Sequence, residues 1–63
     1  MGTRERVEGL LKKHSEGLTV VEIARLSKIS RNTAAVVLAG LLGEKKIWIR
    51  PVGVAKLHYW GKR

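Results

Sequence analysis

The sequence contains no cysteine, so neither a disulfide nor a thiolate metal site can stabilise the fold. No apolar run approaches the roughly 20 residues that a membrane-spanning helix needs. The N-terminal residues lead into a charged segment and lack the apolar stretch of a secretory signal. These absences predict a soluble, cytoplasmic protein with no membrane partner.

Groups that carry catalysis are also scarce. The two histidines, His14 and His58, lie far apart in the sequence, and the five acidic residues are glutamates spread singly along the chain. This spacing does not indicate an acid and a base that could act together on one substrate. No glycine-rich phosphate loop is present either. We therefore expect no catalytic residue, no metal site and no cofactor, and we predict that the protein is not an enzyme.

Positive charge is the strongest feature of the amino-acid composition. Thirteen lysine and arginine residues against five glutamates give a net charge of +8. The charges cancel over residues 1–22, whereas residues 23–63 contain nine basic side chains and the single acid Glu44. A basic surface of this kind fits a polyanionic partner, most commonly nucleic acid. A solvated surface kept soluble by its charge is the alternative.

Two short helices joined by a tight turn are predicted between Thr19 and Gly43. Thr19 and Glu22 have the spacing of a capping box, so the first of these helices should begin at Val20. The turn is assigned to residues 27–29. The buried side of this helix is expected to consist of Ile23, Ala24 and Leu26.

Capping and helical spacing also predict the other two helices. Ser30 offers a hydroxyl to the free N–H groups of the second helix of the pair, which ends near Gly43. The inner face of that helix is expected to consist of Ala34, Val37, Leu38 and Leu41. An earlier amphipathic helix, capped by Thr3, should bury Val7, Leu10 and Leu11.

These residues resemble the helix-turn-helix of winged-helix transcription regulators. The resemblance rests on Glu22-Ile23-Ala24, Leu26-Ser27 and Ile29-Ser30-Arg31-Asn32-Thr33, and on residues 45–60, which look like a β-hairpin wing. It is nearest in kind to small ArsR-like and MarR-like regulators, especially archaeal ones, whose wings often end in a run similar to residues 55–59. The resemblance implies an α+β fold, a winged helix-turn-helix of three helices with a C-terminal two-stranded β-hairpin wing, forming one DNA-binding domain over residues 1–63.

The pairing of the hairpin strands is predicted from the burial of apolar side chains. A loop of residues 53–55 sets Ile49 opposite Tyr59 and Trp48 opposite Trp60. A two-residue loop instead sets Ile49 opposite His58, which leaves an apolar face unused. We therefore expect the three-residue loop, with an inward face made of Ile47, Ile49, Leu57 and Tyr59.

The resemblance implies DNA contacts from the second helix of the pair and from the wing. Arg31 suits guanine, Asn32 suits adenine, and Thr33 suits a phosphate or a thymine methyl. The alternative is that Asn32 and Thr33 only satisfy the helix start. The wing cations have an alternative as well, because strand edges carry lysine to discourage aggregation. The predicted DNA-binding residues are Lys28, Ser30, Arg31, Asn32, Thr33, Ala35, Val36, Lys45, Lys46, Arg50 and Lys56.

The sequence thus predicts specific or semi-specific binding of double-stranded DNA, as a transcription regulator or its DNA-binding module. Such domains often work as dimers, so a homodimer is an allowed assembly. Two alternatives remain open. One is a winged-helix protein-interaction module that uses the apolar outer face of residues 31–43, and the other is RNA binding.

Overall fold

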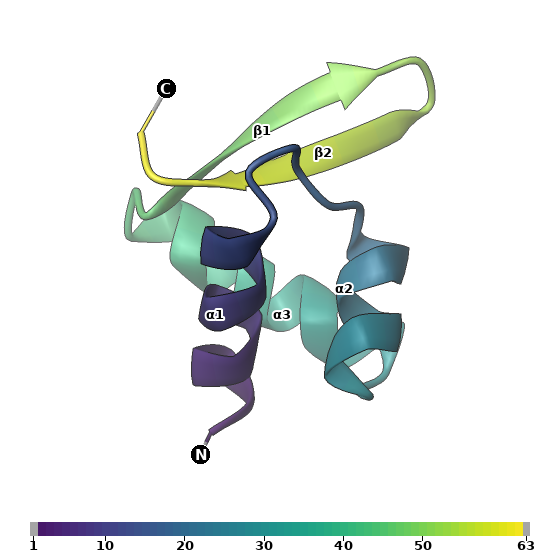
Figure 1. Ribbon diagram of the computed structural model, residues 1–63, viewed down its shortest axis with the longest axis vertical. Helices are drawn as coiled ribbons and strands as arrows, with labels where there is room; N and C mark the ends of the chain where they lie inside the picture. The colour runs from purple at the N-terminus through teal and green to yellow at the C-terminus, as the bar shows by residue number, and fades with distance from the viewer. Residues whose placement is uncertain (1, 63) are drawn as a thin grey trace.

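Three helices precede an antiparallel hairpin in the computed structural model, which describes residues 2–62 (Figure 1). The helices are α1 (Thr3–Lys13), α2 (Val20–Ser27) and α3 (Arg31–Gly43), and the strands are β1 (Ile47–Val52) and β2 (Ala55–Trp60). In Figure 1, α3 crosses behind α1 and α2, and the hairpin lies above them. This α+β layout is consistent with a winged helix, as the sequence predicts.

Helix α1 begins one residue earlier than a Thr3 cap requires. Gly2 is the N-cap and makes no side-chain capping bond, while Thr3 is the first helical residue. The prediction of a Thr3 cap is therefore wrong. The earlier start allows the Arg6 N–H to donate to the Gly2 carbonyl at 3.2 Å, a backbone bond that a Thr3 cap would forfeit. Val7 and Leu11 are buried, as predicted.

The predicted capping box opens helix α2. The Glu22 N–H donates to Thr19 Oγ1 at 3.2 Å, and the Thr19 N–H donates to Glu22 Oε1 at 2.9 Å. The prediction that Leu26 is buried is wrong, because its side chain is 50% exposed and Ser27 is buried instead. Ile23, Ala24 and Ser27 lie on one side of the helix, and Leu26 points about 110° away from the centre of that side.

A left-handed lysine ends helix α2. Lys28 has φ 58°, in the region that glycine occupies at many helix ends. The Lys28 N–H donates to the Arg25 carbonyl at 3.3 Å, and the Ile29 N–H donates to the Ala24 carbonyl at 3.0 Å. These two bonds are the pattern of a Schellman motif. The sharp turn toward α3 is therefore made without glycine.

Helix α3 begins and ends where the sequence predicts, with a second left-handed lysine after its end. Ser30 is the N-cap, and its Oγ accepts a bond from the Thr33 N–H at 3.1 Å. The last helical residue is Gly43, but the left-handed residue is Lys45, at φ 60°. Another Schellman pair follows, because the N–H groups of residues 45 and 46 each donate at 3.0 Å to the carbonyls of residues 42 and 41.

The hairpin uses the two-residue loop, so the predicted register is wrong. Ile49 lies opposite His58, and Trp48 lies opposite Tyr59. Gly53 has φ 61° at the first position of the loop, where a type II′ turn has its glycine. The register therefore follows the turn chemistry rather than the pairing of apolar side chains.

A contact with the loop before α2 explains how His58 is accommodated on the inner side of the hairpin. Leu18 forms an isolated bridge to His58, with backbone N–H to carbonyl distances of 3.1 and 2.8 Å. The His58 Nδ1–H also donates to the Leu18 carbonyl, at 2.9 Å. His58 is consequently 7% exposed, because its ring has a hydrogen-bond partner in the interior.

Side chains alternate between the two faces of the hairpin, and the register decides which share a face. Ile47 is buried in the core beside Trp60, whose ring packs against the core and lies 4.8 Å from Lys12 Nζ. Trp48 and Tyr59 stack on the other face with ring centroids 4.4 Å apart. The predictions that Leu57 and Tyr59 share the inward face, and that Trp48 pairs with Trp60, are therefore wrong.

The core lies between the three helices and the inner face of the hairpin. The predicted inner face of α3 is present: three of its residues are buried, and Val37 is partly buried against them. The buried apolar residues are Val7, Leu11, Leu18, Ile23, Ala24, Ala34, Leu38, Leu41 and Ile47. This core holds α3 with its opposite side in solvent, which sets the geometry of the candidate site.

Candidate nucleic-acid interface

The turn between α2 and α3 gathers five of the predicted DNA-binding residues. Exposed side chains are contributed by Lys28 at the end of α2 and by Arg31 and Asn32 at the start of α3. Ser30 and Thr33 form the helix cap, since the Ser30 hydroxyl donates to Thr33 Oγ1 at 2.9 Å and also receives the Thr33 N–H. Thr33 therefore takes part in capping α3, which is the role that the alternative interpretation gives it. Asn32 takes no part in this cap.

Arg25 belongs to the same basic cluster, although the sequence-based prediction omitted it. It is exposed in the last turn of α2, three residues before Lys28. Residues three apart on a helical turn are neighbours. The spacing of the two cations is the signal that could have identified it. With Arg31 on the next helix, the turn carries three exposed cations, which we call the turn cluster: Arg25, Lys28 and Arg31.

Lys45 and Lys46 lie at the far end of α3. Helix α3, which has thirteen residues and a length of about 20 Å, runs from the turn cluster to this pair. Lys45 is exposed, whereas Lys46 Nζ lies 3.5 Å from Glu44 Oε1. Only Lys45 of this pair presents its charge without a neighbouring carboxylate among the described residues.

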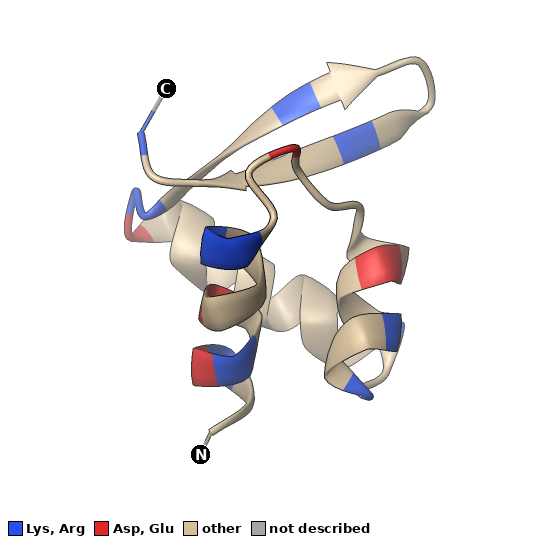
Figure 2. Ribbon diagram, viewed as in Figure 1, with Lys and Arg blue, Asp and Glu red and all other residues tan. Residues whose placement is uncertain are grey.

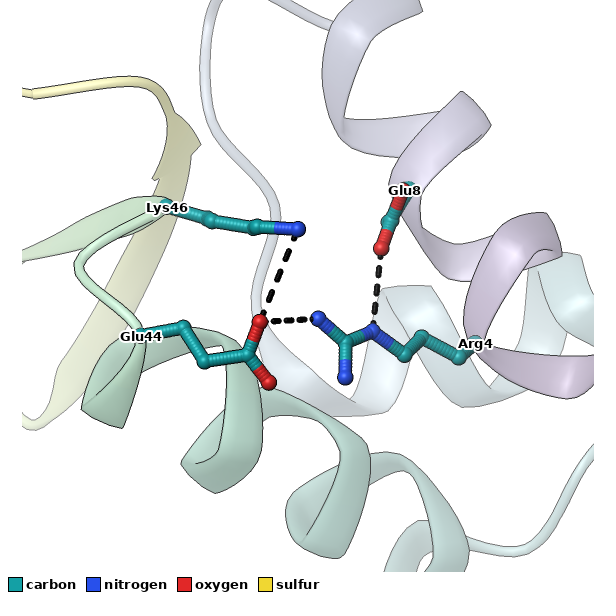
Figure 3. Close-up of polar contacts among 4 residues, drawn as sticks. All are labelled: Arg4, Glu8, Glu44 and Lys46. Carbon is teal, nitrogen blue, oxygen red and sulfur yellow. Dashed lines mark hydrogen bonds and ion pairs between the residues drawn. The ribbon is translucent and has the colours of Figure 1, made fainter.

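Glu44 is the centre of an ion-pair cluster that joins α1 to the end of α3 (Figure 3). The Arg4 guanidinium donates to both Glu44 and Glu8, with Nε 3.0 Å from Glu8 Oε2. The hydrogen bonds to Glu44 and Glu8 raise the pKa of Arg4, and the bond from Arg4 lowers the pKa of Glu44. Glu44, the single acidic residue of residues 23–63, is thus paired with cations on the α1 side of the molecule, away from the turn cluster.

The two cations of the hairpin point to opposite faces. Arg50 lies opposite Leu57, and Lys56 lies opposite Pro51. These two pairs are adjacent along the hairpin, and side chains of adjacent pairs point to opposite faces. Lys56 shares the face of Ile49 and His58, which line a groove beside α3. Arg50 is on the face of the Trp48–Tyr59 stack. The structure does not bring the two predicted wing contacts together on one face.

Between these cations, α3 carries no charge. Figure 2 shows basic residues on α1, at the turn and on the hairpin, with a long uncharged part of α3 behind them. Its only charged residue is Arg31. Val36 is 72% exposed, and Ala35 and Ala39 are exposed as well. The exposed face of α3 therefore has small apolar side chains at its centre and cations at its margins.

An open apolar groove of about 610 Å³ lies between α3, the start of α2 and the hairpin. Ala35, Ala39 and Leu42 form its α3 wall, and Ile49 and His58 belong to its hairpin wall. Of these, only Ala35 was in the predicted set. No local sequence pattern indicates the groove, because it is formed by elements that meet only in the folded chain.

Residues 2–62 contain neither a candidate membrane-spanning helix nor a candidate metal site. No helix in this range is long and apolar enough to cross a membrane. Within the same residues, no group of three or more histidines and acidic residues is placed to hold a metal ion. Comparison with models of protein families, with curated proteins and with solved structures finds no significant match to this chain.

Proposed function

We propose that this domain binds double-stranded DNA through α3 and the hairpin, as a transcription regulator or its DNA-binding module. The exposed first turn of α3 supports the proposal. Ser30 and Thr33 satisfy the helix start between them, so Arg31 and Asn32 are available for base edges. The net charge of +8 supplies the attraction to phosphate.

The observation that carries the proposal is the conformation of two lysines. Lys28 and Lys45, at opposite ends of α3, are the only non-glycine residues with positive φ in the part of the chain that the structure describes. A left-handed conformation costs a residue with a β-carbon about 1–2 kcal/mol, which glycine avoids. A lysine at such a position is explained if its charge contributes to binding. The phosphates that flank a helix inserted in the major groove would be its binding partners.

The docking that this arrangement favours places α3 in the major groove and the Lys56 face of the hairpin toward the backbone beside it. Arg25, Lys28 and Lys45 then contact phosphates at the two ends of α3. Val36 and Ala35 face base edges without hydrogen-bonding groups, so their contacts are with thymine methyls. We expect modest sequence specificity, set mainly by Arg31 and Asn32.

Selection of bound sequences from randomised duplex DNA tests this proposal, with single-stranded DNA and RNA as competitors. Enrichment of a duplex motif, with the duplex preferred over both competitors, is the expected result. A homodimer would enrich two inverted half-sites about 34 Å apart, whereas a monomer would enrich one. Equal competition by RNA or by single strands would refute duplex binding as the function.

A second candidate function is favoured by the exposure of Val36. An aliphatic side chain that is 72% exposed at the centre of an uncharged helix face also fits a protein-interaction surface. Val36→Lys distinguishes the two functions. It should preserve or strengthen non-specific duplex binding if α3 enters DNA, and it should disrupt a complex in which Val36 is buried. Loss of a measured assembly, with unchanged affinity for duplexes, would favour the second function.

A further inference from the structure

The groove beside α3 shares Ala35 and Lys56 with the proposed DNA contacts, but the aliphatic composition of its walls is not explained by those contacts. Its α3 wall consists of Ala35, Ala39 and Leu42, and Val21 and Ile49 face them from α2 and β1. All of these side chains are aliphatic, and no phenylalanine, tyrosine or tryptophan lines the groove. A volume of about 610 Å³ lies within the range of about 300–1,000 Å³ that is typical of small-molecule sites.

The groove also has a cation and a rigid polar edge. Among residues 2–62, Lys56 belongs to the lining as its only lysine or arginine, and no acidic residue does. His58, next to it on the inner face, is held by the bond from its Nδ1–H to the Leu18 carbonyl at 2.9 Å. Because this bond fixes the ring, the hairpin wall is formed before any ligand arrives. The lining thus combines an aliphatic trough with a single positive charge at its edge.

We infer that this groove binds a small aliphatic carboxylate, with an alkyl chain along α3 and its carboxylate at Lys56. The aliphatic walls offer dispersion contacts to a flexible chain, and among residues 2–62 the imidazole of His58 is the only ring in the lining. Charge complementarity selects an anion over a neutral or cationic chain. The inference does not depend on DNA binding.

The charge of the chain also argues against a second copy as the occupant of the groove. Each copy carries a net charge of +8, so two copies repel one another unless anions intervene. A small carboxylate instead reduces the net charge on binding. A concentration-dependent dimer that covers the groove would therefore be a distinct outcome, and the experiment below detects it.

Calorimetric titration with hexanoate, octanoate and decanoate below their micelle concentrations, and with 1-octanol, tests the inference. Each methylene that enters the groove strengthens binding by up to about fourfold, from its transfer free energy. Octanoate should bind about two- to fivefold more tightly than 1-octanol, as expected for one partly exposed ion pair. Amide chemical shifts of ¹⁵N-labelled protein should change along Ala35, Ala39 and His58.

Two pairs of matched variants locate the site. Lys56→Gln should remove the preference for octanoate over 1-octanol, whereas Arg50→Gln, on the other face of the same hairpin, should leave it unchanged. Ala39→Leu fills the groove and should weaken all of the alkyl ligands by about fourfold or more. Val36→Leu places the same leucine side chain on α3 outside the groove and should leave them unchanged.

Several results would overturn the inference. They are the absence of binding by decanoate, equal affinity for octanoate and 1-octanol, equal effects of the two cation substitutions, and shifts that map outside the groove. Sedimentation that shows a dimer, with no titration by alkyl chains, would assign the groove to a second copy. The failure of duplex selection would refute the proposed function and would leave these titrations unaffected.

Discussion

The ring of Tyr59 lies against the backbone of Gly17, so close that a β-carbon added to Gly17 would be 2.7 Å from Tyr59 Cζ. Gly17 precedes Leu18, whose bridge to His58 places the loop beside β2. Trp48 stacks on the same ring from β1. An aromatic side chain that covers a glycine on the neighbouring strand restores the contact that the glycine lacks. Tyr59 thus joins the hairpin to the loop before α2.

Gly17→Ala should destabilise the fold by about 1–3 kcal/mol, because the methyl group would clash with Tyr59 and Gly17 has φ 92°. Urea unfolding followed by circular dichroism measures the change. Gly9→Ala is the control, since a β-carbon at this helical position meets nothing within 4 Å and should stabilise by about 0.5–1 kcal/mol. Equal effects of the two substitutions would contradict the Tyr59 contact.

Ser27→Ala should raise the free energy of unfolding by about 1 kcal/mol. The Ser27 hydroxyl is fully buried and has no hydrogen-bond partner among residues 2–62, a situation that costs about 1–3 kcal/mol. Alanine removes the hydroxyl and leaves the bond from Arg6 to the Ser27 carbonyl, at 3.0 Å, intact. Thermal and urea unfolding check the prediction. A decrease in stability would show that the hydroxyl has a partner in solution.

Lys28→Gly and Lys45→Gly should each stabilise the isolated domain and weaken its binding to DNA. Glycine relieves the left-handed strain, which we expect to add about 1 kcal/mol to the free energy of unfolding. The loss of a phosphate contact should reduce the slope of log affinity against log salt by about 1. Parallel unfolding and duplex titrations give both quantities. If stability rises while DNA affinity stays constant, these lysines are not phosphate contacts.

Glu44→Gln should make stability less sensitive to acid. The bond from Arg4 lowers the pKa of Glu44 in the folded protein, so the stabilisation is complete above the unfolded pKa of about 4.3. It is lost as the pH falls through the lower pKa of the folded state. Unfolding midpoints from pH 7 to pH 2 should therefore fall less steeply in the variant. Arg4→Gln should have a similar effect, and unchanged pH dependence in both variants would refute the pairing.

Duplex affinity should fall with salt by about 0.9 log units per log unit for each phosphate contact. Arg25, Lys28, Lys45 and Lys56 together predict a slope near minus four. Lys56→Gln should reduce the magnitude of this slope by about one, whereas Arg50→Gln, on the opposite hairpin face, should change it little. Titrations between roughly 50 and 200 mM salt provide the slopes. A larger effect of Arg50→Gln would place the DNA on the other face of the hairpin.

Local sequence signals determined the helix-turn-helix. The Thr19–Glu22 capping box, the Ser30 cap and the end of α3 at Gly43 all depend on hydrogen bonds between residues a few positions apart. Such signals can be read without knowledge of the rest of the chain. The left-handed lysines were harder to foresee, because glycine is the usual residue at a helix end and Lys45 carries no signal of its own.

Tertiary contacts decided the burial of His58 on the inner face of the hairpin, the side of α2 that is buried and the groove beside α3. His58 could be placed inside only because Leu18, 40 residues earlier, accepts its ring N–H. Leu26 is exposed because the buried side of α2 runs along Ile23, Ala24 and Ser27. The groove joins α2, α3 and the hairpin. Each of these features depends on which distant surfaces meet, and spacing within one segment does not contain that information.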